Sequence, residues 1–294
     1  MTVKECPYLQ SKENPEKDSI LTMEHRELSI ILMISQANLN AIEFELPPVQ
    51  EQAKVVSILS ALDDKIELNQ KINENLERQA QIFLQRWLLE NNGQYTSKPL
   101  AEVAEINSDT YSLKESWEYV NYLDTSSITG GTISEIQYIC PETEKLPSRA
   151  RRKVQKGDIV YSTVRPNQRH FGMISSPLPN MLASTGFAVI RSTQPKICNE
   201  LIYLLITDNN FIEKMQQLAE QSTSTFPSIK SSDLGTCLIP CPTGTNGDEL
   251  STQLKTLYSS IAINHQQNEK LAMVRDTLLP KLMSGEIDVS NIWL

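Results

Sequence analysis

Basic side chains are the most promising candidates for chemistry in this chain, because they gather in one segment. From Lys145 to Arg169 there are eight Lys or Arg and one acidic residue, Asp158, so the local balance is 8 − 1 = +7. Arg and Lys neutralise phosphate groups, and Arg, Asn and Gln can make paired hydrogen bonds to base edges. The segment therefore predicts a nucleic-acid-binding face. A solvated basic hairpin that keeps an acidic protein soluble is the alternative.

Three short runs carry the expected contacts to nucleic acid. The candidate DNA-binding residues are Arg149, Arg151, Arg152, Lys153, Ser162, Thr163, Arg165, Asn167, Gln168, Arg169, His170, Thr223, Ser224, Thr225 and Lys230. Asn167 to Arg169 are expected in a loop between two strands, where side chains are free to reach base edges. In the loop 223–230, the hydroxyls and Lys230 could contact phosphate or could be ordinary turn and cap groups.

Catalytic and metal-binding patterns are missing from the sequence. It has no phosphate-binding glycine loop, no Gly-x-Gly-x-x-Gly and no Gly-x-Ser-x-Gly. None of the three histidines has a cysteine or a carboxylate pair at a metal-ligand spacing. Cys237 and Cys241 are four residues apart around Pro240, and we expect buried strand thiols there rather than zinc ligands. The chain is therefore expected to bind rather than react, with no metal and no cofactor of its own.

An internal repeat, 195 residues apart, is the clearest organising feature. The shift takes Leu39 to Leu234, Pro47 to Pro242 and Asn73 to Asn268, and the match fades before Asn38. Within each copy, apolar and small residues recur with alternating steps of four and three, which is a heptad seam. The expected seam residues are Leu62, Ile66, Asn69, Leu76, Phe83, Leu257, Ile261, Asn264, Leu271 and Leu278.

The two copies predict two long helices that pair with each other. The first runs from about Val49 to Glu90; in the second, Pro280 bends or ends the last turns before Ser284-Gly285. Antiparallel pairing is favoured, because a parallel pair would force the intervening domain to cover a length of roughly 50–60 Å. Asn69 and Asn264 would then be buried on the seam and fix its register. The alternative is that these asparagines face solvent.

The segment between the helices has the pattern of a mixed α/β domain with a twisted, mostly antiparallel sheet. Strands are expected at Tyr119–Leu123, Thr132–Ile139, Asp158–Val164, Phe171–Ile174 and Phe187–Ile190, and a helical stretch at Leu201–Glu220. Gly130-Gly131 predicts a tight hairpin turn. The fold class is thus α+β, with a divergent N-terminal segment at 1–37, a first helical region at 38–93, the mixed domain at 94–236 and a second helical region at 237–294.

Composition is that of a soluble protein without membrane spans. No apolar run approaches the ~20 residues that cross a bilayer, and the N-terminus lacks a secretion-signal pattern. Five scattered cysteines fit reduced thiols in the cytoplasm better than a disulfide framework. The net charge of −9 weighs slightly against a nucleic-acid binder. The concentration of basic charge in one segment weighs in the opposite direction.

Several motifs resemble type I restriction–modification specificity subunits. They are Leu46–Gln52, Lys65–Asn69, Glu74–Leu76, Lys156–Tyr161, Phe226–Ile229 with Leu234, and Arg275–Ile287. The first three resemble the central conserved region of that family, and the last closely resembles its C-terminal conserved region. The others resemble its target-recognition domain. Together they cover about residues 38–289.

The resemblance implies a non-catalytic subunit that reads double-stranded DNA. In the family, a pair of conserved antiparallel helices separates two recognition domains, each of which reads half of a split site. Modification subunits, which bind adenosylmethionine, dock along the helices and methylate adenine, and a restriction/translocase subunit joins for cleavage. This chain departs from the pattern, because only one complete recognition domain is recognisable. We therefore expect a half-specificity subunit that needs a second copy of itself or another chain. The alternative is a scaffold or inhibitor that occupies the methyltransferase docking surface without reading DNA.

Overall fold

The computed structural model describes residue 36 and residues 47–92, 95–112, 114–222, 226–242 and 246–290. The chain divides into one unit of residues 1–48 and a second of residues 49–294, and the description below concerns the second. The expectation of a divergent segment at 1–37 lies outside the described residues, Gln36 excepted. No helix in the described part of the chain is long and apolar enough to cross a bilayer.

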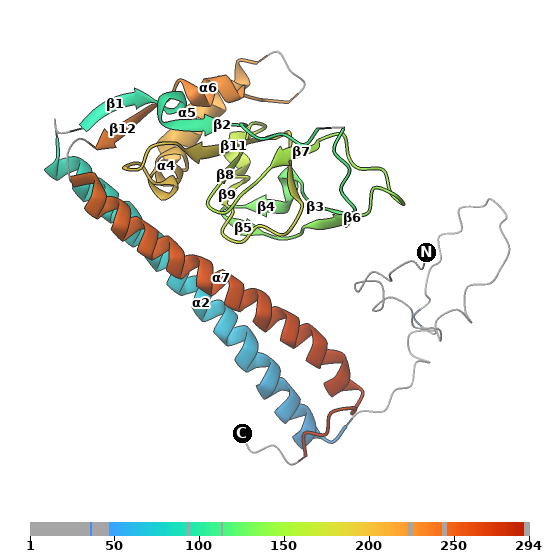
Figure 1. The fold of residues 1–294 in the computed structure, drawn as a ribbon. Helices are drawn as coiled ribbons and strands as arrows, with labels where there is room; N and C mark the ends of the chain where they lie inside the picture. The colour runs from blue at the N-terminus through green and yellow to red at the C-terminus, as the bar shows by residue number, and fades with distance from the viewer. Residues whose placement is uncertain are drawn as a thin grey trace. The chain divides into compact units, whose positions relative to one another are not determined.

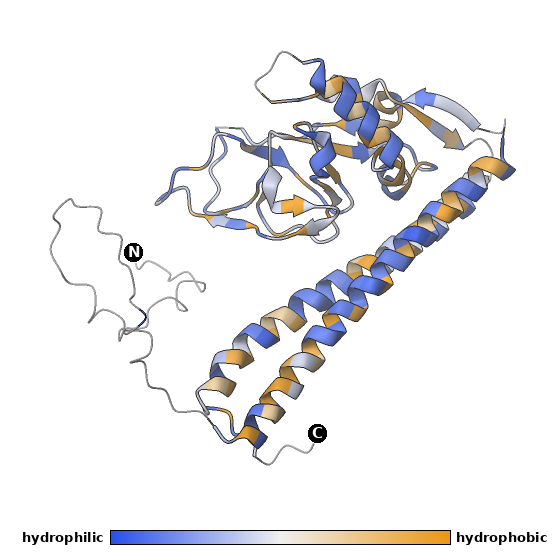
Figure 2. Ribbon diagram, turned by 180° about the vertical axis from the view of Figure 1, so that it is seen from behind, coloured by the Kyte–Doolittle hydropathy of each residue, from blue (hydrophilic) through white to orange (hydrophobic). Residues whose placement is uncertain are grey.

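Two long helices, α2 (Val49–Glu90) and α7 (Asn246–Met283), lie side by side, and hydrophobic residues recur along both (Figures 1 and 2). The predicted bounds of the first helix are confirmed. Pro280 lies inside α7 and does not end it, because the helix continues for three more residues. Gly285 follows in a left-handed conformation with φ +75°, which is the usual way for a glycine to end a helix.

The helices are antiparallel, as predicted. Asn69 Nδ2 donates to Asn268 Oδ1 over 2.8 Å, and Asn264 Nδ2 donates to Asn73 Oδ1 over 2.7 Å. The numbers of each pair have the same sum (69 + 268 = 73 + 264 = 337), which is the register of an antiparallel pair. The shift of 195 converts Asn69 into Asn264 and Asn73 into Asn268, so it exchanges the two pairs. A local two-fold axis therefore passes between them.

Every expected seam residue is buried or half-buried, so the predicted helix interface is confirmed. Asn69 has only 1% of its surface exposed, and the alternative that the seam asparagines face solvent is wrong for it. Asn264 is half-buried and bonded across the interface. Because a buried amide must find a partner, this polar layer favours the one register in which the amides meet.

Between the helices lie two four-stranded sheets, where the sequence predicted one. The first has the order β6 (Gln137–Ile139), β3 (Val120–Leu123), β10 (Met181–Ser184), β7 (Ala150–Lys153). The second has the order β2 (Ala104–Ile106), β11 (Phe187–Ser192), β8 (Ile159–Ser162), β9 (Phe171–Met173). All neighbours are antiparallel except β3 and β10, so the mostly antiparallel prediction is confirmed.

The expected turns and helices of this domain are found with one change. Gly130 and Gly131, with φ of +54° and +84°, join β4 (Ile128–Thr129) to β5 (Thr132–Ile133) in the predicted tight hairpin. The predicted helical stretch is two helices, α4 (Asn199–Ile206) and α5 (Asn209–Glu220). They are separate because Asp208 caps α5, its carboxylate accepting a hydrogen bond from the amide of Asn210.

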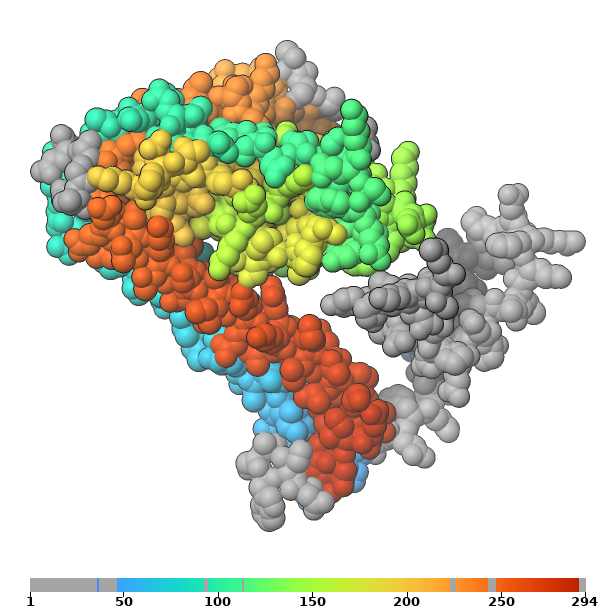
Figure 3. All heavy atoms as spheres, in the orientation of Figure 1, coloured from blue at the N-terminus to red at the C-terminus, as the bar shows by residue number. Residues whose placement is uncertain are grey.

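The domain and one end of the helix pair share a core. β1 (Tyr95–Pro99) follows α2 and pairs with β12 (Leu238–Pro242), which precedes α7. Short helices α3 (Leu100–Val103) and α6 (Ser231–Gly235) pack beside this ribbon. The core includes Ala80, Leu84 and Trp87 of α2, Leu250 and Leu254 of α7, and Leu201 and Ile202 of α4. Figure 3 shows the α4 region against the first turns of α7. The rings of Tyr203 in α4 and Tyr258 in α7 meet edge to face, with centroids 5.7 Å apart.

Candidate nucleic-acid interface

A loop with an unusual backbone follows β8 and carries the predicted reading residues. Its centre is a 3₁₀ turn, η3 (Pro166–Gln168), flanked by Arg165 and Arg169 with φ of 48° and 56°. Left-handed conformations are uncommon for residues other than Gly, Asn and Asp, and such strain is often found at binding sites. Pro166 is buried, whereas Asn167, Gln168 and Arg169 are exposed. The backbone therefore presents three adjacent polar side chains outward, as the sequence predicted.

Hydrogen bonds within the turn and to α5 hold this loop. Gln168 N donates to Arg165 O over 2.9 Å, and Arg169 N donates to Pro166 O over 3.1 Å. From α5, Asn209 Oδ1 accepts from Arg169 Nη2 over 2.7 Å. The loop is thus fixed by the turn itself and by a neighbouring helix, and no pattern in the sequence predicted the second contact.

The segment 226–230 lies against this loop and extends the surface. Ile229 N donates to Thr163 O and Arg165 N donates to Pro227 O, each over 2.9 Å. The Arg165 guanidinium carbon lies 4.8 Å from the centre of the Phe226 ring. Two segments that were predicted separately, about sixty residues apart in the sequence, therefore form one surface. Thr223, Ser224 and Thr225 lie outside the described residues.

Lys230 lies at the other end of this segment and is exposed. Its amide donates to Asp233 Oδ2 over 2.7 Å, and Asp233 N donates back to Lys230 O over 2.9 Å. The backbone of Lys230 thus caps α6, in agreement with the cap alternative, while its ammonium group points to solvent and stays a candidate for phosphate contact.

Three predicted DNA-binding residues next to the loop have side chains that are hydrogen-bonded within the domain. Ser162 is buried and donates through Oγ to Val164 O over 2.8 Å, so it supports the loop from inside instead of lying on its surface. Thr163 Oγ1 donates to Gly186 O over 3.0 Å. His170 Nδ1 lies 2.7 Å from Ile128 O, which fixes the ring toward the β4–β5 hairpin. Thr163 and His170 are half-buried, whereas Ser162 is buried.

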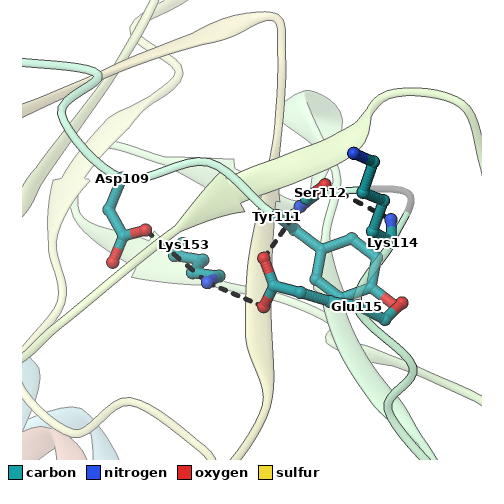
Figure 4. Close-up of polar contacts among 6 residues, drawn as sticks. All are labelled: Asp109, Tyr111, Ser112, Lys114, Glu115 and Lys153. Carbon is teal, nitrogen blue, oxygen red and sulfur yellow. Dashed lines mark hydrogen bonds and ion pairs between the residues drawn. The ribbon is translucent and has the colours of Figure 1, made fainter.

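The basic run on β7 is less available than its sequence suggests. Lys153 Nζ lies 2.9 Å from Glu115 Oε2 and 3.6 Å from Asp109 Oδ1 (Figure 4). The same atom lies 5.6 Å from the centre of the Trp117 ring. The hydrogen bond to Glu115 raises the pKa of Lys153, and the same bond lowers the pKa of Glu115. The charge of Lys153 is therefore largely engaged in holding residues 109–117 against the sheet.

The three arginines of the same run differ in exposure. Arg151 and Arg152 are half-buried; Arg151 Nε donates to Ser148 O over 3.2 Å, and burial lowers the pKa of Arg152. Arg149 is exposed, and its carbonyl accepts from Thr185 N over 2.8 Å. The neighbouring Gly186 O accepts from Thr163 N over 2.9 Å. Residues 185 and 186 therefore connect the backbone of Arg149 to the start of the loop that contains Arg165.

The single acidic residue of the basic segment does not oppose this surface. Asp158 is fully buried, and both of its oxygens accept from the Arg191 guanidinium over 2.7 Å. Its charge is therefore compensated inside the domain by an arginine from β11. The neighbouring helix α5, which packs against η3, exposes Glu213 and Glu220, so the surface near the loop carries charges of both signs.

No reactive or metal-binding arrangement is found in the part of the chain that the structure describes. It contains no group of three or more His, Cys, Asp or Glu placed to hold a metal ion. Cys237 and Cys241 are buried at the β12 strand, as predicted, and burial raises the pKa of both thiols. In the loop region, Arg165, Arg169 and Lys230 form no ion pair among the described residues.

Comparisons with known proteins agree with the resemblance. Residues 9–78 match the model of the type I restriction modification DNA specificity domain. The chain is 28% identical over 133 residues, 45% of its length, to the type I restriction enzyme HindI specificity subunit of Haemophilus influenzae. It is 24% identical over 280 residues, 87% of its length, to the type I restriction enzyme MjaIX specificity subunit of Methanocaldococcus jannaschii. These matches cover 29% and 63% of the relatives' own lengths.

A solved structure of the S subunit of a type I restriction–modification system from M. genitalium covers 82% of this chain. The superposition has a TM-score of 0.48 and 17% sequence identity, and it includes 62% of that subunit. The family match begins at residue 9, so part of the segment before Asn38 resembles the family as well. Together, the family model and the curated relatives confirm the predicted relationship to type I specificity subunits.

Proposed function

We propose that this relative of the type I specificity subunits reads double-stranded DNA with the surface formed by residues 163–169 and 226–230. The observation that carries the proposal is the convergence of these two segments around Arg165. Among the described residues, no carboxylate lies within ion-pair distance of Arg149, Arg165, Arg169 or Lys230. Free cations are what phosphate contacts require, and Asn167 and Gln168 add the side-chain amides that read adenine edges.

In this proposal the chain is not itself catalytic and directs its partners. Modification subunits docked on the helices supply adenosylmethionine and methylate adenine at the site that the chain selects, and a restriction/translocase subunit joins them in the cytoplasm. The chain binds no cofactor. Residues 163–169 and 226–230 bind the DNA and select its sequence, and they do not catalyse a reaction. This agrees with their side chains, which include no nucleophile with an adjacent base.

The test reverses two charges of the loop in the complete complex. The motif is first determined by methylome sequencing of a host that carries the chain and its modification subunit. Binding of a duplex with that motif is then compared for the wild type and for Arg165→Glu/Arg169→Glu. We expect a loss of affinity of at least about tenfold, and a salt dependence whose log–log slope falls by about 1.8, because each phosphate contact contributes about 0.9.

A matched control reverses two exposed lysines away from the loop, Lys98→Glu/Lys255→Glu, with the same change in net charge. We expect this control to bind within about threefold of the wild type, because neither lysine belongs to the proposed reading surface and charges at a distance are screened by salt. Equal losses in both variants would mean that only net charge matters, and the loop would then not be the reading surface.

We also propose that a second copy, or another specificity chain, supplies the other half of a split site. The repeat supports this, because it places similar residues at both ends of the helix pair. At the end that carries the domain, Leu84 is 7% exposed and Ser251 is 5% exposed. Their repeat mates at the other end, Leu279 and Val56, are 40% and 60% exposed. Among the described residues, the leucine position is covered at one end and exposed at the other, and Val56 exposes a further apolar side chain there, as an equivalent site for a second domain would.

Light scattering of the chain with its modification subunit, with and without duplex, tests this second part. We expect a DNA-bound complex with two specificity chains, and its loss in Leu279→Glu/Met283→Glu, where both side chains are exposed at the open end. The control is Leu89→Glu, an exposed leucine of the end that carries the domain. A complex with one specificity chain that methylates a two-part site would contradict the half-specificity proposal.

The second candidate function is a scaffold or inhibitor that occupies the methyltransferase docking surface without reading DNA. The net charge of −9 is the observation that favours it. The same charge reversal separates the two functions. If Arg165→Glu/Arg169→Glu leaves DNA binding by the methyltransferase complex unchanged while the chain still binds the modification subunit, the scaffold is the correct function.

A further inference from the structure

Arg165 and Phe226 form a cation–π contact on the proposed reading surface. Phe226 is 54% exposed, so its ring is only partly buried in the domain. The guanidinium group of Arg165 lies 4.8 Å from the ring centre, within the distance of a cation–π interaction. The Phe226 ring therefore contacts the Arg165 cation near the surface and is not buried in the hydrophobic core.

The backbone beneath this pair is held at both ends. Arg165 N donates to Pro227 O over 2.9 Å, and a bridge joins Val164 to Ser228. Arg165 itself has φ 48° and ψ 67°, a conformation that surrounding contacts must maintain. These contacts fix the Cα positions of Arg165 and Phe226. The orientation of the Arg165 side chain then depends on the contact between its guanidinium group and the Phe226 ring.

Arg165 differs from Arg191 and Lys153 in what orients it. Arg191 is oriented by Asp158 and Lys153 by Glu115, so both charges are neutralised by their partners. Phe226 is uncharged, so it can orient Arg165 while leaving its full charge for an anionic ligand. An arginine that is ordered before binding loses less side-chain entropy when it makes its contact.

We infer that Phe226 is a positioning residue that holds the Arg165 guanidinium ready for DNA. This inference rests on the proposed DNA-reading function and deepens it. Phe226 is expected to act through Arg165, without itself contacting a base. Loss of the ring should then weaken DNA binding while the number of phosphate contacts stays the same.

The experiment is a double-mutant cycle on the complete complex with its modification subunit, using a duplex that carries the methylome-determined motif. Phe226→Ala is expected to weaken binding two- to fivefold, which corresponds to about 0.5–1 kcal/mol for an exposed cation–π pair. Its salt slope should stay at the wild-type value. Arg165→Ala should lower the slope by about 0.9, as one lost phosphate contact does. The double variant should bind like Arg165→Ala, because Phe226 has no cation left to position.

Two conservative variants separate positioning from support of the fold. Phe226→Trp keeps an aromatic face and should bind within about twofold of the wild type, since indole is the better cation–π partner. Phe226→Leu keeps an apolar side chain without the π face and should bind like Phe226→Ala. Thermal unfolding of each variant shows whether the domain is intact. Equal binding by the leucine variant and the wild type would overturn the inference.

Two other outcomes would contradict a positioning role for Phe226. Losses for Phe226→Ala and Arg165→Ala that simply add in the double variant would show that the two side chains act independently. A greater loss for Phe226→Ala than for Arg165→Ala would show that the ring itself contacts DNA; both results contradict positioning. Failure of the wild-type complex to bind the duplex would instead remove the proposed function, so the two failures are distinguishable.

Discussion

The two ends of the helix pair have related sequences and different surroundings. At the near end, next to the domain, Leu84, Trp87, Leu250 and Leu254 are buried in a core that the domain completes. Their repeat mates at the far end are Leu279, Leu282, Val55 and Leu59. There Leu282 is buried, Val55 and Leu59 are half-buried, and Leu279 is exposed. The repeat therefore specifies a symmetric frame, while burial at each end depends on what packs against it.

The largest expected effect comes from truncating the same repeat position at both ends. Leu254 is fully buried, so Leu254→Ala should lower the free energy of unfolding by about 2–5 kcal/mol. Leu59→Ala, its repeat mate, should cost about half of that or less, because Leu59 is only half-buried. Urea denaturation followed by circular dichroism measures both. Equal losses would show that the far end is packed as tightly as the near end, and the comparison would fail.

The asparagine layer between the ends should give the next largest effect. Asn69→Leu leaves the amide oxygen of Asn268 without its donor inside the helix pair, and we expect a loss of about 1–3 kcal/mol. The double variant Asn69→Leu/Asn268→Leu should lose less than the sum of the single variants, because neither polar group then lacks a partner. Chemical denaturation of the four proteins completes the cycle.

The two-fold related pair provides the control for this layer. The same cycle at Asn73 and Asn264 should give a coupling of the same sign, because the repeat exchanges the two pairs. Asn73 Nδ2 is buried without a hydrogen-bond partner among the described residues, so Asn73→Leu should cost less than Asn69→Leu. Couplings of opposite sign would show that the layer is not symmetric in energy, whatever its geometry.

Local patterns predicted the helix pair well, because its contacts follow from a heptad that both helices carry. The bounds of α2 and the seam residues could be read directly. The split between α4 and α5 could have been found from the Asp208 cap signal, but the apolar pattern continues through it. The division into two sheets and the parallel pairing of β3 with β10 depend on register between distant strands, for which the sequence has no local signal.

The candidate site was predicted in residue type but not in arrangement. The basic composition indicated both the β7 run and the Arg165 loop, and it could not distinguish the neutralised Lys153 from the unpaired Arg165. That difference depends on Glu115 and Phe226, which are 38 and 61 residues away along the chain. Charge in a segment thus indicates a candidate surface, whereas the availability of each charge is decided by tertiary contacts.

The smallest expected effect concerns a charge that only the near end carries. Glu77 of α2 lies beside the domain, and its repeat mate at the far end is Ala272. Burial, and to a smaller extent the charge of Glu74, raises the pKa of Glu77. A carboxyl whose pKa is higher in the folded state destabilises the fold when ionised, and this penalty disappears as the pH falls through the raised value toward the ordinary value of about 4.3.

Glu77→Gln should therefore stabilise the protein at pH 7–8, by about 0.5 kcal/mol for a single partly exposed site, and the gain should shrink toward pH 4. Thermal unfolding across this pH range measures it. The control is Glu269→Gln, an exposed carboxylate of α7 that should change stability little at any pH. If Glu77→Gln instead destabilises at pH 8, the carboxylate has a stabilising partner at the near end, and the domain is joined to the helix pair by charge as well as by apolar packing.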